Sequence, residues 1–198
     1  MDSDLSAPSL PPAPVALPEL RDELLLMQER QRQLSDYLQA ALFRSVPIPA
    51  ERARELTRQA AALTSKHGAR LREVFRRYGW PAADLVGPEA SSAAFNIAQS
   101  ANLDPDFQQV ALDALDAALR AGAPVACERA FMTDCVRVGK GLPQLYGTSL
   151  RVVDGDVVPT PIEAPEHVDE RRAGVGLPPL ADHLAQTRAL YESQALAA

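Results

Sequence analysis

The chain has 198 residues, a formal net charge of −6, and 46% hydrophobic but only 5% aromatic residues. This length fits a single domain with enough apolar residues for a core, which excludes a wholly disordered chain. No apolar run approaches the roughly 18 residues of a membrane span, and the acidic balance disfavours nucleic-acid binding. The chain begins with acidic rather than basic residues and holds only two cysteines. We therefore expect a cytoplasmic protein without a secretory signal or disulfides.

The first 18 residues contain five prolines and show no hydrophobic period. Such a segment cannot bury an apolar face, so we expect a disordered, proline-rich tail. The remaining residues, 19–198, are expected to form a single helical domain.

Two long amphipathic helices follow the tail. Apolar residues spaced by three and four predict a helix from Glu19 to about Ala41 and a second one from about Ala50 to Tyr78. Prolines at 47 and 49 separate the two helices. Because the connection is short, the helices are expected to pack antiparallel.

Shorter elements make up the rest of the chain. Residues 89–102 are apolar on nearly all sides, which predicts a buried central helix. Asp104 and Pro105 form a typical helix start. Further helices are expected at about 105–121, 125–138, 165–172 and 180–193. Asp154-Gly155, between two apolar runs, predicts a type I′ hairpin turn. The predicted fold is mainly α, a bundle of about six helices with one β-hairpin near residues 145–159.

Two polar residues, Gln31 and His67, interrupt the apolar stripes of the long helices. Burying such groups without partners costs about 1–3 kcal/mol each, so each needs a hydrogen bond or a ligand. His67 is either a core histidine with satisfied hydrogen bonds or a general acid/base in a pocket between helices.

The helix at 125–138 carries both cysteines and one acid on or beside its apolar face. Cys127 and Cys135 are eight residues apart, about 12 Å along a helix, which excludes a disulfide between them. Each is either a small buried hydrophobe or, for Cys135, a nucleophile paired with His67. Asp134 requires an arginine partner or a role in a site, because it lies on a largely apolar face.

Charged segments and common sequence motifs give less information about function. Residues 44–77 hold nine Lys or Arg against three Asp or Glu, which predicts a solvated basic face or a surface for an acidic partner. Residues 169–172 (Asp-Glu-Arg-Arg) suggest a salt-bridged helix surface or a fixed arginine pair for a carboxylate. No metal, nucleotide or flavin signature is present, so we expect no cofactor.

Several segments, taken in order, resemble a bacterial family known as a domain of unknown function. Its pattern is the series G-W-P, A-Q-H-A-D-x-D-P-x-F-Q, L-T-D-R-V, Q-x-Y-G-T-Q, P-I-E-D and V-D-x-R-R-x-x-x-G-L-x-P-L. The corresponding segments here are residues 79–81, 98–108, 132–136, 144–149, 161–164 and 168–180. The resemblance covers about residues 20–185.

The chain departs from this pattern at ionisable positions. Ser100 and Asn102 stand where the family has His and Asp, Cys135 where it has Arg, and Ser149 where it has Gln. In the first two helices, Gln31, Thr64 and His67 occupy positions where the family shows Asp and D-x-x-N. The resemblance thus implies a shared pocket with exchanged polar groups and no specific reaction.

Two functions are open from the sequence. The first is an enzyme of bacterial specialised metabolism that acts on a small molecule by hydrolysis, dehydration, isomerisation or cyclisation. The second is a non-catalytic relative, such as a small-molecule sensor, a resistance or immunity protein, or a partner subunit. The predicted catalytic residues are His67, Cys135 and Asp134. The predicted ligand-binding residues are Gln31, Trp80, Gln99, Ser100, Asn102, Gln144, Tyr146, Ser149 and Arg171.

Overall fold

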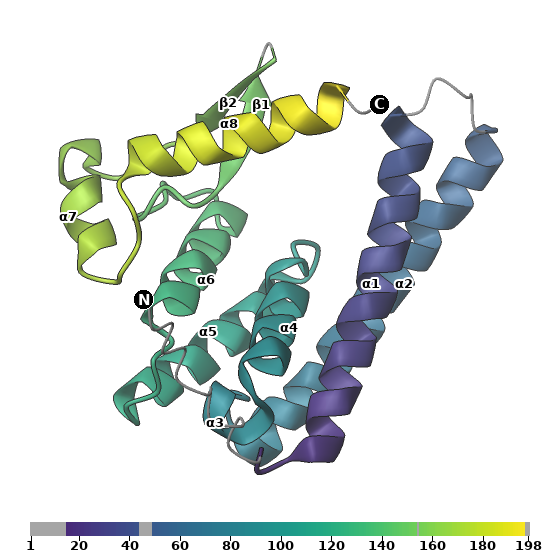
Figure 1. The fold of residues 1–198 in the computed structure, drawn as a ribbon, viewed down its shortest axis with the longest axis vertical. Helices are drawn as coiled ribbons and strands as arrows, with labels where there is room; N and C mark the ends of the chain where they lie inside the picture. Colours follow the sequence, from purple (N-terminus) through teal and green to yellow (C-terminus); the bar gives the residue numbers. More distant parts are fainter. Residues whose placement is uncertain (1–14, 44–48, 154, 197–198) are drawn as a thin grey trace, which may run out of the picture.

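The computed structural model describes residues 15–43, 49–153 and 155–196. Its elements are α1 (Pro18–Phe43), α2 (Ala50–Tyr78), α3 (Ala83–Val86), α4 (Pro88–Gln99), α5 (Pro105–Arg120), α6 (Ala126–Gly139), β1 (Leu150–Val153), β2 (Asp156–Pro159), the 3₁₀ turn η1 (Pro165–His167), α7 (Val168–Ala173) and α8 (Leu180–Leu196). The predicted mainly α fold with one hairpin is confirmed (Figure 1). Most of the predicted tail (1–14), Pro47 and Asp154 lie outside the described residues.

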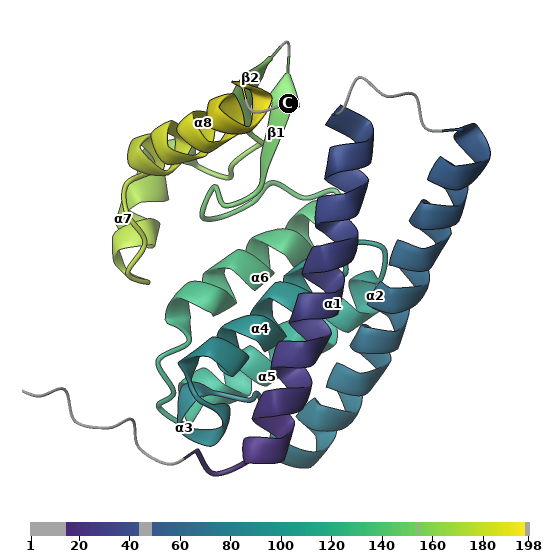
Figure 2. The same cartoon turned by 45° about the vertical axis from the view of Figure 1, so that its right-hand side comes forward.

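Helices α1 and α2 lie side by side and antiparallel (Figures 1 and 2). Their facing stripes are buried toward the body of the protein, with Leu24 and Leu71 fully enclosed. The Arg70 guanidinium clamps the pair by donating to both carboxylate oxygens of Glu23, at 2.6 and 2.8 Å. Tyr78, the last residue of the predicted α2 stripe, is exposed and lies beside the Arg77 guanidinium instead of entering the core.

Helix α4 is the centre of the bundle and contacts α1, α2, α5 and α6. Its buried face consists largely of alanines, which let neighbouring helices approach closely; these are Ala90, Ala93, Ala94 and Ala98. Helix α5 begins as predicted, because the Asp104 side chain accepts the N–H of Phe107 at 2.9 Å and Pro105 takes the first position. Within the described ranges, every helix is too short or too polar to cross a bilayer.

Helix α3 and the start of strand β1 differ from the expectation. Helix α3 was not predicted, because four residues are too few to show a period. Strand β1 begins at Leu150 and not at Leu145, since the backbone N–H groups just before it are bound by side chains and not by a partner strand. In the register of the hairpin, Leu150 lies opposite Pro159. Helix α8 packs on β2 and α7.

Candidate functional site

Gln31 and His67, the two residues predicted to interrupt the apolar stripes, meet each other. Oε1 of Gln31 on α1 lies 3.2 Å from Nδ1 of His67 on α2. Since a carbonyl oxygen can only accept, Nδ1 carries the hydrogen and donates it, which leaves the lone pair on Nε2. The antiparallel pairing of α1 and α2 brings these positions to the same level of the bundle. This hydrogen bond gives buried His67 and half-buried Gln31 one partner each.

The environment of His67 favours the neutral imidazole. The side chain is only 3% exposed. Burial lowers the pKa of His67 from its usual value, and the positive charges of Arg30 and Lys66 lower it further. At neutral pH the ring is therefore uncharged, with Nε2 able to accept a proton.

Two grooves adjoin at Ser100, which lines both. Gln31 lines the first of them, whereas the buried His67 lines neither. The first groove, about 310 Å³, runs between α1 and α4 and is lined by Gln28, Gln31, Arg32, Ser35, Asn96, Ile97, Gln99 and Ser100. The second, about 370 Å³, runs between α2 and the α4–α5 connection and is lined by Thr57, Ala60, Ala61, Thr64, Ser65, Ser100, Asn102, Leu103 and Asp104. We call the two together the polar groove. It gathers four predicted site residues from separate parts of the sequence: Gln31, Gln99, Ser100 and Asn102.

Most residues that line the polar groove carry amides or hydroxyls, although apolar atoms form the larger part of its surface. Ser100 is the C-cap of α4, and its Oγ donates to the Asn96 carbonyl at 2.7 Å. The charged residues of the polar groove already have partners. Arg32 pairs with Glu29 and Asp36 on its own helix. Asp104 accepts a hydrogen bond from Arg72 at 2.8 Å. The groove therefore offers neutral donors and acceptors to a ligand.

Asp134 lies in a different part of the fold and has no exposed surface. Its carboxylate accepts the N–H groups of Leu145 at 2.7 Å, Tyr146 at 3.1 Å and Thr148 at 3.0 Å, and the Thr148 hydroxyl at 2.9 Å. These bonds fold residues 144–149 around one buried negative charge. The predicted need of Asp134 for partners is thus met mainly by backbone N–H groups.

Arg172 supplies positive charge to the same region. Its side chain is 1% exposed and donates to the carbonyls of Tyr146 and Pro178, both at 2.6 Å. The predicted charged helix surface at 169–172 is therefore wrong for Arg172, because this guanidinium is enclosed by the loop that it binds. A six-residue helix shows no period from which this burial could be predicted.

Gln144 and Arg171 complete the same network of hydrogen bonds. Gln144 is fully buried; its Oε1 accepts the Ser149 N–H at 2.8 Å, and its Nε2 donates to the Thr160 carbonyl at 2.9 Å. Arg171 donates to the carbonyls of Leu145 and Glu163 at 2.7 and 2.6 Å. We call this assembly the loop network. It contains five predicted site residues: Asp134, Gln144, Tyr146, Ser149 and Arg171.

Cys135 is half-buried between these two regions and packs against the main core. Burial raises the pKa of its thiol to about 11, and the neighbouring Asp134 charge adds to the shift. The Gln99 side chain acts in the opposite direction but does not reverse it. At neutral pH Cys135 is therefore a thiol and not an activated thiolate. Among the residues that the structure describes, no three His, Cys, Asp or Glu gather in a group that could hold a metal.

The comparison with family models decides the classification of the chain. The model of a family of unknown function, DUF6624, matches residues 18–195. The chain belongs to DUF6624. No curated protein and no solved structure matches it.

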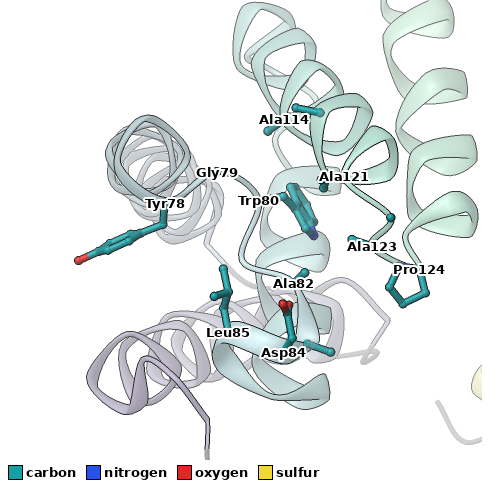
Figure 3. A pocket seen from close by; sticks show the side chains of 14 residues that line it. Tyr78, Gly79, Trp80, Ala82, Asp84, Leu85, Ala114, Ala121, Ala123 and Pro124 are labelled. Atoms are coloured by element: carbon teal, nitrogen blue, oxygen red, sulfur yellow. The ribbon is translucent and has the colours of Figure 1, made fainter.

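Trp80, the remaining predicted site residue of this DUF6624 chain, lines neither the polar groove nor the loop network. It borders a separate pocket between α3 and the end of α5 (Figure 3). The twelve predicted site residues thus fall mainly into two groups, with Trp80 apart and Cys135 between them.

Several groove residues were missed by the sequence analysis. Gln28 and Ser35 lie three residues before and four residues after Gln31, so helical spacing alone could have placed them on the same face. Asn96 similarly precedes Ser100 by one turn. Gln108 lies outside the lining, but its buried side-chain amide donates to the Gln99 carbonyl at 3.1 Å; it ends the segment 98–108 that resembles the family pattern, which could have marked it.

Proposed function

We propose that the protein is a small-molecule enzyme that needs no cofactor, with its substrate in the polar groove and His67 as the general base. The observation that carries this proposal is the hydrogen bond between His67 and Gln31, since Gln31 also lines a groove rich in amides and hydroxyls. The reaction classes that fit are those driven by proton transfer: hydrolysis, dehydration, isomerisation or cyclisation. The segments shared with a bacterial family support a bacterial origin. The exchange of ionisable groups for other polar groups at Ser100 and Asn102 is the reason for placing the enzyme in specialised metabolism.

Gln31 acts as the positioning residue in this scheme. By accepting from Nδ1, it fixes the tautomer of His67 and leaves Nε2 as the proton acceptor. Burial and two nearby positive charges disfavour the imidazolium, so a proton taken from substrate is readily given back. Such a group suits a reaction in which one proton is removed and returned within the same turnover.

The lining of the polar groove indicates the substrate class. Free charges are scarce there, because Arg32 and Asp104 are engaged by neighbouring side chains. Amides and hydroxyls of Gln31, Gln99, Ser100 and Asn102 present both hydrogen-bond donors and acceptors. An uncharged molecule rich in hydroxyl or amide groups, such as a sugar-like or peptide-like compound, is the complementary ligand.

The remaining predicted catalytic residues take other roles in this proposal. Asp134 has its carboxylate oxygens engaged by the loop network, so it holds residues 144–149 and transfers no proton. Cys135 carries a protonated thiol beside Gln99 and contributes packing.

The second candidate function is ligand binding without catalysis. It is favoured by one observation: His67 is almost completely buried and lines neither part of the polar groove. A sensor, a resistance or immunity protein, or a partner subunit would need the groove but not the proton acceptor. The two functions therefore differ in what a change at His67 does.

Incubation of the purified chain with a cell metabolite extract, followed by mass spectrometry, tests the proposal. The chain should deplete one compound and accumulate its product, and His67→Gln should slow this by about 100-fold or more, because glutamine cannot accept the proton. Gln33→Ala, on an exposed face of α1, is the matched control and should retain full turnover. A product formed equally fast by His67→Gln would refute the role of His67. Compounds that stabilise the protein in a thermal-shift assay without being converted would favour the binding protein.

A further inference from the structure

The pocket around Trp80 is a second place where the structure is built to receive a ligand. It has a volume of about 610 Å³, within the roughly 300–1,000 Å³ typical of small-molecule sites. None of the residues of the polar groove lines it. Its walls come from the chain after α2, from α3, and from the last turns of α5 with the following loop (Figure 3).

The walls are small and apolar. Seven alanines line the pocket: Ala82, Ala83, Ala114, Ala117, Ala118, Ala121 and Ala123. Leu85 and Pro124 add further apolar surface, and Figure 3 shows the Tyr78 ring pointing away from the space. Small side chains leave the volume open in place of filling it.

The indole of Trp80 has an unused hydrogen-bond donor in this pocket. Trp80 is 3% exposed, and its Nε1 is buried with no hydrogen-bond partner among the described residues. Figure 3 shows the nitrogen edge of the ring turned toward Ala123 on the pocket wall. A buried N–H of this kind normally has a partner, and leaving it without one is unfavourable. A ligand with an acceptor oxygen would supply that partner.

The position of the indole is fixed by aromatic stacking. The rings of Phe75 and Trp80 stack with centroids 5.2 Å apart, and Phe75 in turn stacks on Phe107 at 6.1 Å. The ring therefore has little freedom to turn its N–H toward another acceptor. The donor is held in place before any ligand arrives.

Asp84 gives the pocket its charge. It is the acidic residue of the lining, it is exposed at the rim, and its carboxylate is turned toward the same space as the indole nitrogen (Figure 3). None of the ion pairs within the described residues includes Asp84. The C-terminal end of α5, whose C-cap Ala121 also lines the pocket, favours positive charge as well.

We propose that this pocket binds a small amine: a molecule with an aromatic or alicyclic body against the alanine walls, an acceptor oxygen for Trp80 Nε1, and an ammonium group for Asp84. The alanine walls, the Trp80 N–H and the Asp84 carboxylate each select one of these three parts of the ligand. The inference is independent of the proposed function, because it uses neither His67 nor the polar groove.

The single tryptophan of the chain makes the test direct, since it gives one indole N–H signal in a ¹⁵N-correlated NMR spectrum. The probes are tyramine, phenethylamine, which lacks the phenol oxygen, and 3-(4-hydroxyphenyl)propionic acid, which replaces the amine by a carboxylate. Tyramine should move the indole proton signal downfield and saturate. Phenethylamine should bind without the downfield shift, and the acid should bind at least about tenfold more weakly than tyramine.

Variants of the pocket residues distinguish binding in this pocket from non-specific binding elsewhere on the protein. Asp84→Asn should bring the affinities for tyramine and the acid together. Ala117→Leu should abolish binding by filling the space; Ala117 is exposed, so the core is not disturbed. Ala69→Leu, at an exposed position of α2, is the matched control and should bind as the unchanged protein does.

The proposal is overturned by any of three results. The first is no saturable response of the indole signal to tyramine up to about 10 mM, the affinity range of small, weakly held ligands. The second is equal affinity for the amine and the acid. The third is unchanged tyramine binding by Ala117→Leu.

Discussion

The Nδ1 atom of His67 lies 3.2 Å from Oε1 of Gln31, so the two polar residues that break the facing stripes of α1 and α2 are each other's partner. Each would be costly in this interface alone, because a buried donor or acceptor without a partner is destabilising. Together they form one polar contact between the two long helices. This pairing has consequences for stability that can be measured.

Replacing both members of the pair should cost less than the sum of the two single replacements. Gln31→Leu leaves the buried N–H of His67 without an acceptor and should lower the free energy of unfolding by about 1–3 kcal/mol. His67→Leu should have a comparable effect on Gln31. The double variant should lose less than the sum of the two, since no polar group then remains unpaired. Urea unfolding of the four proteins measures this coupling; strictly additive effects would contradict the hydrogen bond.

Acid should weaken the fold through two histidines. Burial lowers the pKa of His67, and of His183 on α8, below the usual value. Because the folded state disfavours protonation, this stabilisation is fully present above the unfolded pKa of about 6.5 and is lost as the pH falls through the lowered pKa values. The free energy of unfolding should therefore decrease from pH 7 toward pH 5.

The double variant His67→Gln/His183→Gln tests the source of this loss. Its unfolding free energy should depend less on pH in this window than that of the unchanged protein, although its absolute stability is lower. Chemical unfolding at a series of pH values measures both slopes. An equally steep loss in the double variant would assign the effect to other groups.

The long elements of the fold could be predicted because their signals are local. The bounds of α2, Ala50 and Tyr78, were predicted from a neighbouring proline and from Gly79, which ends the helix with a φ of 72°. Helix α3 and the burial of Arg172 could not be predicted, since helices of four and six residues show no period. The start of β1 depended on Asp134, which is far from it in sequence.

The candidate site was predictable only in part, because only some of its contacts follow from local sequence patterns. Gln31 and His67 stood out as interruptions of the stripes on two helices expected to pack together, but that they lie at the same level and contact each other is visible only in the structure. Asp134 and Gln144 stood out as well, but the sequence could not distinguish a ligand-binding side chain from one that binds its own backbone. That distinction depends on where residues 144–149 pass, which is a property of the tertiary structure.

Asp134 should be among the residues most sensitive to substitution. Asp134→Asn removes the negative charge that faces three backbone N–H groups and one of the charges, beside Asp169, that favour the charged form of buried Arg172. A loss of about 1–3 kcal/mol in unfolding free energy is expected, because a neutral amide leaves buried donors without their acceptor. Hydrogen exchange should show faster exchange at the amides of Tyr146 and Thr148.

An exposed aspartate on α5 gives the matched control for this change. Asp113 accepts only from Gln109 one turn away, so Asp113→Asn should alter stability by less than about 0.5 kcal/mol. Retained protection of the Tyr146 and Thr148 amides in Asp134→Asn would contradict the role of the carboxylate as the anchor of the loop.

Cys135 should react slowly with alkylating reagents. Only the thiolate is nucleophilic, and burial raises the pKa of this thiol to about 11, against about 8.5 for a free cysteine. Near neutral pH the thiolate fraction is then roughly 300-fold smaller than in a free cysteine, and the rate with iodoacetamide should fall by at least that factor. Mass spectrometry that resolves Cys135 from Cys127 measures the two rates separately. Burial also raises the pKa of Cys127, so both cysteines should react slowly while the protein is folded and quickly in urea.

Alkylation of Cys135 in the folded protein at the rate of a free thiol would show an activated thiolate. It would restore the nucleophilic role predicted from the position of Cys135 in the sequence.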